Sequence, residues 1–289
     1  MFKGGTSLSK AYGVIERFSE DIDLTYDITA FIPDLAKETG GKPPTQSQAN
    51  RWTDEVRKKL PEWVETVAMK SVSEALIAQG LEATLATDGD KLLIDYAAAT
   101  SGTGYVKPQV VAEFGARSTG EPSQEVEIDC DAALTLTTLA FPSATVRAMA
   151  PERTFWEKAT AVHVFCSGGR HRGRPAFARH WHDLVKLDAH GFATSAIANR
   201  ALAAAVAEHK KYFFREKDEA SVVIDDAAAV KGALKLVPDG ARLDELRNDY
   251  ENMIRDGLLE GDESPFDDLL AMVREIEKLA NTENPNLIE

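Results

Sequence analysis

Apolar and polar residues alternate between Asp21 and Tyr26, with the period of a half-buried β-strand. On such a strand Ile22 and Leu24 point into a core, whereas Asp21 and Asp23 project together from the opposite face. Two like charges side by side on a strand repel each other and destabilise the sheet. We therefore expect a cation to offset them, and a divalent metal ion with oxygen ligands is the simplest candidate.

A glycine turn lies shortly before this strand. Gly4 and Gly5 allow a tight turn, Thr6 and Ser7 are favourable residues for a helix N-cap, and apolar residues follow at helical spacing from Leu8. The backbone N–H groups of such a turn attract phosphate. Only three residues precede the glycines, so we expect almost no strand leading into the turn. A phosphate-binding turn beside a metal-binding Asp pair suits a nucleoside triphosphate with magnesium.

The rest of the pattern predicts an α+β fold. Strand-like runs occur near 81–86 and 92–96, joined by a hairpin at 88–90, then at 110–116 and more weakly at 126–128 and 145–149. Helical spacing covers about 48–81, with Pro61 starting a second helix, and later about 152–166, 176–188, 195–214, 242–256 and 265–281. A mixed half followed by a helical half predicts a core domain at 1–150 and a helical domain at 151–289.

Composition narrows the class of protein. The chain is 44% hydrophobic and 28% charged, as in a globular protein, and its formal net charge is −14. Such an acidic surface excludes broad non-specific nucleic-acid binding but leaves room for a local basic groove. Cys130 and Cys166 are too few for a disulfide framework. The sequence has no run of about 18 apolar residues, which a membrane-spanning helix would require. We expect a soluble, cytoplasmic protein that makes no membrane contact.

Three charged residues outside the first motif are candidates for a site, each with a plainer alternative. Glu113 lies among apolar residues, where a charge is costly unless it is paired or metal-bound, although an edge-strand Glu facing water fits equally well. Lys158 follows a helix start at Pro151, and a lone helical lysine is ordinarily solvated. Asp183 lies four residues after Arg179, which by spacing alone indicates an ordinary intrahelical ion pair.

The stretch 167–175 and the helix after it are the most basic part of the chain. Arg170, Arg172, Arg174 and Arg179 fall close together in an otherwise acidic sequence. Glycine and arginine together suggest a flexible arm that contacts phosphates, either of RNA or of an incoming triphosphate. The alternative is a solvated loop.

Three separated motifs resemble those of one enzyme family. The first is Gly4-Gly5-Thr6-Ser7-Leu8 followed by Arg17-Phe18-Ser19-Glu20-Asp21-Ile22-Asp23-Leu24. The others are Thr154-Phe155-Trp156-Glu157-Lys158 and Arg179-His180-Trp181-His182-Asp183-Leu184. In this order they resemble the AbiEii/AbiGii-type nucleotidyltransferases, toxins of toxin–antitoxin and phage-defence systems that include the MenT proteins. These share the core of DNA polymerase β-like nucleotidyltransferases.

The resemblance implies a role for each motif. The stretch Gly4–Ser7 would hold the triphosphate, and Asp21 and Asp23 would bind Mg²⁺ or Mn²⁺. A third carboxylate is expected on a neighbouring strand, with Glu113 as first candidate and Glu127 and Asp129 behind it. Lys158 would contact the nucleotide phosphates. Asp183 would either orient Lys158 or act as a base, and the sequence does not decide between these roles.

The resemblance also implies a reaction and its partners. We expect transfer of a nucleoside monophosphate from an NTP to an acceptor hydroxyl, in a cleft between the two domains. RNA is the expected acceptor, with a tRNA 3′ end leading, and growth arrest opposed by a cognate antitoxin is the expected outcome. Two other classes of function remain: a phosphotransferase or kinase that uses the same cleft, and a non-catalytic module that binds nucleotide or a partner protein.

Overall fold

The computed structural model describes residues 1–17, 21–98, 108–169, 176–259, 261 and 263–282. The chain divides into two compact units, which are considered separately below. We call Met1–Ser7 with Ser19–Ala148 the sheet unit, and Leu8–Phe18 with Met149–Glu289 the helical unit. The short segment Leu8–Phe18 thus groups with the helical half, which the sequence pattern alone did not indicate.

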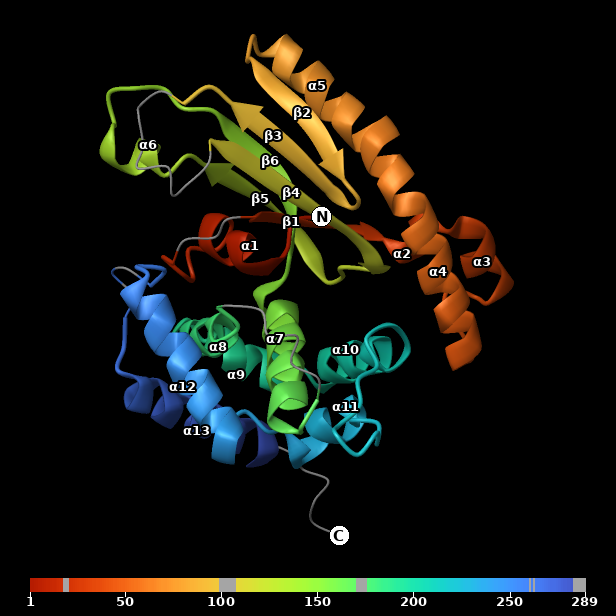
Figure 1. Ribbon diagram of the computed structural model, residues 1–289, viewed down its shortest axis with the longest axis vertical. Coiled ribbons are helices and arrows are strands. Elements are labelled where there is room, and N and C mark those ends of the chain that lie inside the picture. Colours follow the sequence, from red (N-terminus) through yellow and green to blue (C-terminus); the bar gives the residue numbers. More distant parts are fainter. Residues whose placement is uncertain (18–20, 99–107, 170–175, 260, 262, 283–289) are drawn as a thin grey trace. The chain divides into compact units, whose positions relative to one another are not determined.

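The sheet unit is built on a four-stranded mixed sheet with the strand order β1-β4-β3-β2 (Figure 1). These strands are β1 (Asp21–Asp27), β2 (Ala83–Asp88), β3 (Lys91–Tyr96) and β4 (Gln109–Ser118). β1 runs parallel to β4, whereas β3 is antiparallel to both β4 and β2. The hairpin expected at 88–90 is confirmed, since Asp88 pairs with Lys91 across the turn. The α+β fold class is likewise confirmed.

One long helical stretch covers the apolar face of this sheet. It consists of α4 (Gln46–Trp63), the π-helical segment η1 (Val64–Ala68) and α5 (Met69–Ala78). The ring of Trp63 packs 5.6 Å from that of Phe114 on β4 and 5.3 Å from that of Tyr26 on β1. The face that carries Ile22 and Leu24 is therefore the covered face, and Asp21 and Asp23 project from the other.

The sequence pattern had predicted that Pro61 begins a second helix, and this prediction is wrong. Pro61 lies inside α4, and the helix continues through η1 into α5. Proline lacks an N–H group and so removes one hydrogen bond from a helix. The π-helical segment η1 begins shortly after the proline, at Val64, whose N–H is shared between the carbonyls of Leu60 and Pro61. The helix thus continues past Pro61 without a break.

Phe2 links the four-stranded sheet to a smaller strand pair. β5 (Ser123–Asp129) pairs with β6 (Ser143–Met149), and Phe2 forms a parallel bridge to Ala148 and an antiparallel bridge to Leu24. The segment Met1–Lys3 is held by backbone hydrogen bonds on both sides. Short helices complete the unit: α2 (Ile28–Phe31), α3 (Pro33–Glu38) and α6 (Ala132–Thr135).

The helical unit packs around α7 (Pro151–Cys166), which contacts α8 (Arg179–Ala189), α9 (Phe192–Ala198) and α10 (Arg200–Phe213). One side of α7 is apolar and lies in the core, where Phe155, Trp156, Ala159 and Val162 are fully buried. The remaining elements are α11 (Asp226–Ala228), the π-helical segment η2 (Ala229–Ala233), α12 (Gly240–Arg255) and α13 (Phe266–Thr282). None of the helices in the described part of the chain combines the length and hydropathy that a membrane span requires.

The single helix expected at 195–214 is in fact two helices. α9 ends at Ala198 and α10 begins at Arg200, with Asn199 between them at φ −84° and ψ 76°. The Asn199 side chain accepts a hydrogen bond from the Leu202 N–H at 3.1 Å, which satisfies one of the free N–H groups at the start of α10. An asparagine within an alanine-rich run is thus a cap.

Candidate active site

The register of β1 and β4 places three carboxylates on one face of the sheet. Asp21 and Asp23 are two residues apart on β1, and Glu113 on β4 lies directly opposite Asp23. In a parallel pair, residues in register project from the same face. The strand expected to carry the Asp pair and the strand expected to carry Glu113 are therefore neighbours.

Glu113 forms an ion pair with a lysine of the next strand. Its Oε2 lies 3.0 Å from Nζ of Lys91 on β3, and both side chains are partly exposed. The hydrogen bond to Glu113 raises the pKa of Lys91 against the effect of burial, and the charges of Glu113 and Asp21 add to the rise. β4 is a central strand, so Glu113 does not lie on an edge strand, although its side chain is partly exposed.

The acidic face is compatible with a metal ion shared with a substrate. Across the described ranges, no group of three or more His, Cys, Asp or Glu side chains is gathered into a metal site. Magnesium is commonly held by one or two carboxylates together with substrate phosphates and water, without an all-protein cage. Asp21 and Asp23 offer oxygen ligands of that kind. The other two candidates, Glu127 and Asp129, lie on β5 of the smaller strand pair.

The glycine turn packs directly against the second aspartate. Gly4 has a φ of +75°, and a Cβ atom at this position would lie 2.1 Å from Oδ2 of Asp23. The Lys3 N–H donates to the Asp23 carbonyl at 3.0 Å, which fixes the turn to β1. A residue other than glycine would meet both an unfavourable backbone conformation and the carboxylate. Gly4 thus allows the backbone of the turn to approach Asp23.

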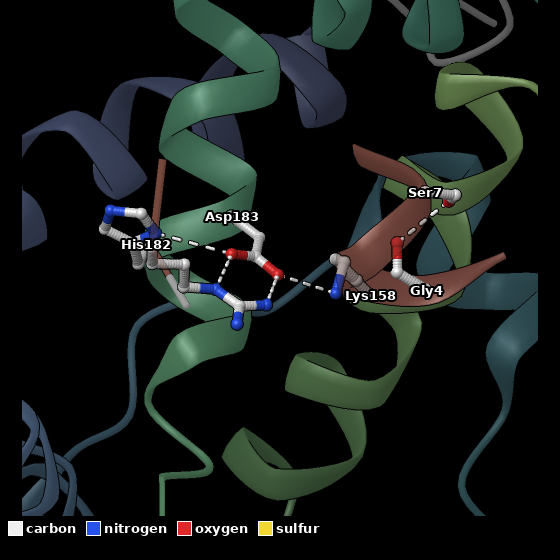
Figure 2. Close-up of polar contacts among 6 residues, drawn as sticks. Gly4, Ser7, Lys158, His182 and Asp183 are labelled. Carbon is white, nitrogen blue, oxygen red and sulfur yellow. Dashed lines mark hydrogen bonds and ion pairs between the residues drawn. The ribbon is translucent and has the colours of Figure 1, made fainter. Parts of the chain in front are cut away.

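The helix after this turn begins earlier than expected. α1 (Gly4–Lys10) starts at the first glycine, so Thr6 and Ser7 lie within its first turn and are not N-cap residues. The Thr6 hydroxyl donates to the Asp21 carbonyl. The Ser7 hydroxyl donates to the Gly4 carbonyl at 3.0 Å (Figure 2). Both side chains therefore stabilise the turn and its attachment to β1.

In the helical unit, Asp183 is the centre of a buried charge cluster. It lies on α8 and is fully buried, and its two oxygens accept hydrogen bonds from Nε and an Nη of Arg17 at 2.7 and 2.8 Å. Nζ of Lys158 on α7 lies 2.8 Å from Oδ2, and Nδ1 of His182 lies 3.3 Å from Oδ1. Figure 2 shows Lys158 and His182 approaching different oxygens of the same carboxylate.

The cluster keeps Asp183 ionised. Burial by itself raises the pKa of this carboxyl, but the charges of Lys158 and Arg17, with hydrogen bonds from Arg17 and His182, hold it well below its usual range. A carboxylate stabilised in this way is a weak proton acceptor. The geometry thus favours the role in which Asp183 orients Lys158 over the role of a base.

The intrahelical pair suggested by spacing is replaced by this long-range contact. Arg179 is exposed, whereas the Asp183 carboxylate is enclosed by Arg17 and Lys158. Arg17 belongs to the first sequence motif, but no role was expected for it from the sequence. The available signal was its position four residues before Asp21. Its burial, with 6% of its surface exposed, could not be read from an isolated arginine in a polar run.

Only part of the basic stretch can be located. Arg170, Arg172 and Arg174 lie outside the described residues, and Arg179 is exposed at the first position of α8. The chain between this stretch and α8 is anchored by Asp249 of α12, whose two carboxylate oxygens accept the N–H groups of Ala176 and Ala178 at 2.9 and 2.7 Å.

Among the comparisons with known proteins, the match to a family model agrees with the motifs. No curated protein sequence matches the chain significantly. Among solved structures, MenT4, a nucleotidyltransferase toxin from Mycobacterium tuberculosis H37Rv, is similar at 18% identity and a TM-score of 0.36, over 97% of this chain and 83% of MenT4. The model of the family described as "Nucleotidyl transferase AbiEii toxin, Type IV TA system" matches residues 1–272. The chain therefore belongs to the AbiEii family of nucleotidyltransferase toxins.

Proposed function

We propose that this chain transfers a nucleoside monophosphate from an NTP to a hydroxyl group of RNA, with a tRNA 3′ end as the first acceptor to examine. The observation that supports this most directly is the packing of the Gly4 backbone against the Asp23 carboxylate. A Cβ atom on Gly4 would lie 2.1 Å from Oδ2 of Asp23. This packing supports the proposal because N–H groups of the turn would bind phosphate next to carboxylates that would bind a metal ion.

In the proposed reaction the acceptor oxygen attacks the α-phosphorus of the NTP. A new P–O bond forms to the acceptor, the bond to the bridging oxygen breaks, and pyrophosphate leaves. The acceptor hydroxyl loses its proton to solvent. A Mg²⁺ ion bound by Asp21 and Asp23 would neutralise triphosphate charge and favour ionisation of the hydroxyl. The backbone of Gly4–Ser7 holds phosphate oxygens.

Lys158 and Asp183 have complementary roles in this proposal. Lys158 places a positive charge on the phosphates, where a flexible ammonium suits a changing charge distribution. Asp183 is a positioning residue, because its carboxylate holds Nζ of Lys158 at 2.8 Å and is itself held by Arg17. Glu113 would be the third carboxylate. To bind the metal ion it would have to leave its ion pair with Lys91.

RNA binding is assigned to the basic stretch. Arg170, Arg172, Arg174 and Arg179 would contact the phosphates of the acceptor. Replacing these four arginines with glutamine should weaken tRNA binding and lower its salt dependence, because fewer counterions are released. An unchanged dependence of the dissociation constant on salt would contradict this assignment.

The reaction is tested with NTPs labelled on the α- or the γ-phosphate, each base in turn, together with Mg²⁺ and total tRNA. We expect label to enter RNA from the α-position only, and to be lost with Asp23→Asn and with EDTA. Incorporation from the γ-position would identify a kinase. No incorporation from either, despite NTP binding, would contradict RNA modification. In cells, expression of the wild type but not of Asp23→Asn should arrest growth, and a cognate antitoxin should relieve the arrest.

A further inference from the structure

We propose that the free edge of β2, together with the groove between β2 and α5, binds an extended, basic segment of a partner protein as an additional β-strand. β2 is the last strand of the four-stranded sheet, and β3 is its only neighbour within the described part of the chain. Its outer N–H and C=O groups are therefore available to a further strand.

This edge lacks the protection that natural sheets commonly carry. The side chains of β2 that point away from the helices are Thr84, Ala86 and Asp88, and the strand contains no proline and no lysine. Charged side chains, prolines and bulges are the usual means by which an edge strand avoids pairing with another chain. A strand with one acidic residue at its end is open to pairing.

An apolar groove lies beside the same edge. It has a volume of about 700 Å³ and is lined on the helix side by Met69, Leu76 and Ile77, and on the strand side by Leu81, Ala83 and Leu85. Figure 1 shows α5 running alongside β2. Ile77 is 75% exposed and Leu81 is 55% exposed, which is unusual for large aliphatic side chains that lie next to each other on a surface. A strand added to β2 would direct every second side chain towards this groove.

The charge around the groove selects the kind of partner. Glu65, Glu74 and Glu82 are part of its lining. Among the described lining residues Lys70 is the only basic one, and its Nζ lies 3.9 Å from Oε1 of Glu74. Between residues 62 and 90 the chain carries six acidic side chains and one basic one. This potential repels nucleic acid and attracts a segment in which apolar residues alternate with lysine or arginine.

A second copy of this chain fits the edge poorly. Antiparallel pairing of two β2 strands about Leu85, which keeps the same face of both strands on one side, would place Asp88 of one copy opposite Glu82 of the other. Like charges at such positions destabilise the pairing. The acidic surroundings therefore favour a basic heterologous partner.

The test uses a fluorescent peptide of alternating lysine and valine, and measures its binding to the full chain by anisotropy. We expect saturable binding that weakens with added salt. Ile77→Lys should weaken it by about tenfold, because it removes apolar area that the peptide would bury and adds a charge that repels the peptide's lysines. Val222→Lys is the matched control, because Val222 is also an exposed aliphatic residue, at 60%, and does not line the groove. It should bind as the wild type does.

Two further probes distinguish strand addition from simple charge attraction. The same peptide with N-methylated backbone amides should bind weakly, because it cannot donate the hydrogen bonds of a β-ladder. A peptide of alternating glutamate and valine should not bind. Equal binding of all three peptides, equal binding by Ile77→Lys and Val222→Lys, or no binding up to about 1 mM would overturn the proposal. So would a homodimer, seen by sedimentation, that Ile77→Lys abolishes.

Discussion

Arg17 and Asp183 form a two-point hydrogen-bonded ion pair in the interior of the helical unit, at 2.7 and 2.8 Å, although 166 residues separate them in the chain. The same carboxylate binds Nζ of Lys158. Because an arginine fork fixes both oxygens of a carboxylate, Asp183 has little freedom to rotate away from Lys158. Residues from the first and last motifs thus combine to set the position of the lysine in the middle motif.

Asp183→Asn should destabilise the protein by about 3–5 kcal/mol, because it leaves two buried cations without a counter-charge. Urea denaturation measures the loss. The matched control is Asp267→Asn, which disrupts the 2.8 Å pair of Asp267 with Arg247, whose side chains are 78% and 39% exposed. That variant should lose less than about 1 kcal/mol. Comparable losses in the two variants would contradict the view that burial makes the Asp183 cluster important.

Arg17→Lys separates positioning from folding. It keeps the buried positive charge but cannot form the two-point contact with Asp183. We expect the folded state to survive, with a fall in kcat for nucleotidyl transfer and a nearly unchanged KM for NTP. Circular dichroism checks the fold, and steady-state kinetics gives the two constants. A change in KM alone would assign Arg17 to substrate binding.

Gly4→Ala should abolish nucleotidyl transfer, because the new methyl group would lie 2.1 Å from Oδ2 of Asp23 and displace it. The positive φ adds a strain of roughly 1–2 kcal/mol. Gly89→Ala is the control for strain alone: Gly89 has a φ of +60°, and a Cβ there meets nothing within 4 Å. Gly89→Ala should lose stability but keep activity. Similar activity in the two variants would show that the contact with Asp23 is dispensable.

Lys91 and Glu113 provide a test of the third carboxylate. Glu113→Gln should raise the Mg²⁺ concentration that gives half-maximal activity, whereas Lys91→Met should lower it by releasing Glu113 from its 3.0 Å ion pair. Neither change should alter the free energy of unfolding by more than about 1 kcal/mol, since the pair is partly exposed. An unchanged Mg²⁺ requirement in both variants would restrict Glu113 to pairing with Lys91.

Stability should fall between about pH 6.5 and pH 4 because of His163. Burial, with the charges of Lys210 and Lys235, lowers the pKa of His163 to about 4. In the unfolded chain the pKa of this histidine is about 6.5. The unfolded state therefore binds a proton first as the pH falls. The stability present above the unfolded pKa is lost towards the folded pKa, at up to about 1.4 kcal/mol per pH unit.

His163→Asn tests this pH dependence by urea denaturation at several pH values. The substitution keeps a hydrogen-bond acceptor for the Lys235 N–H, which donates to Nδ1 of His163 at 3.0 Å. We expect a shallower loss of stability in acid than in the wild type. Parallel curves for the two proteins would show that other groups cause the loss.

The sequence by itself determined the local elements and the faces on which their side chains lie. Alternation in β1 placed Asp21 and Asp23 together on one face, because the side-chain pattern of a strand repeats every two residues. Boundaries were less secure wherever a single residue had two possible roles. Pro61 lies inside a continuous helix and does not begin a new one, whereas Asn199 caps the start of a new helix.

The tertiary structure alone decided which charged groups pair. Spacing indicated Arg179 as the partner of Asp183, but in the structure Arg17 and Lys158 bind it. Lys91 contacts Glu113 because the register of β3 and β4 places these two residues opposite each other. Exposed ions gain little from a neighbour on the same helix, but a buried carboxylate must find counter-charges wherever the fold brings them. That requirement acts over the whole chain, so local periodicity cannot reveal the partner.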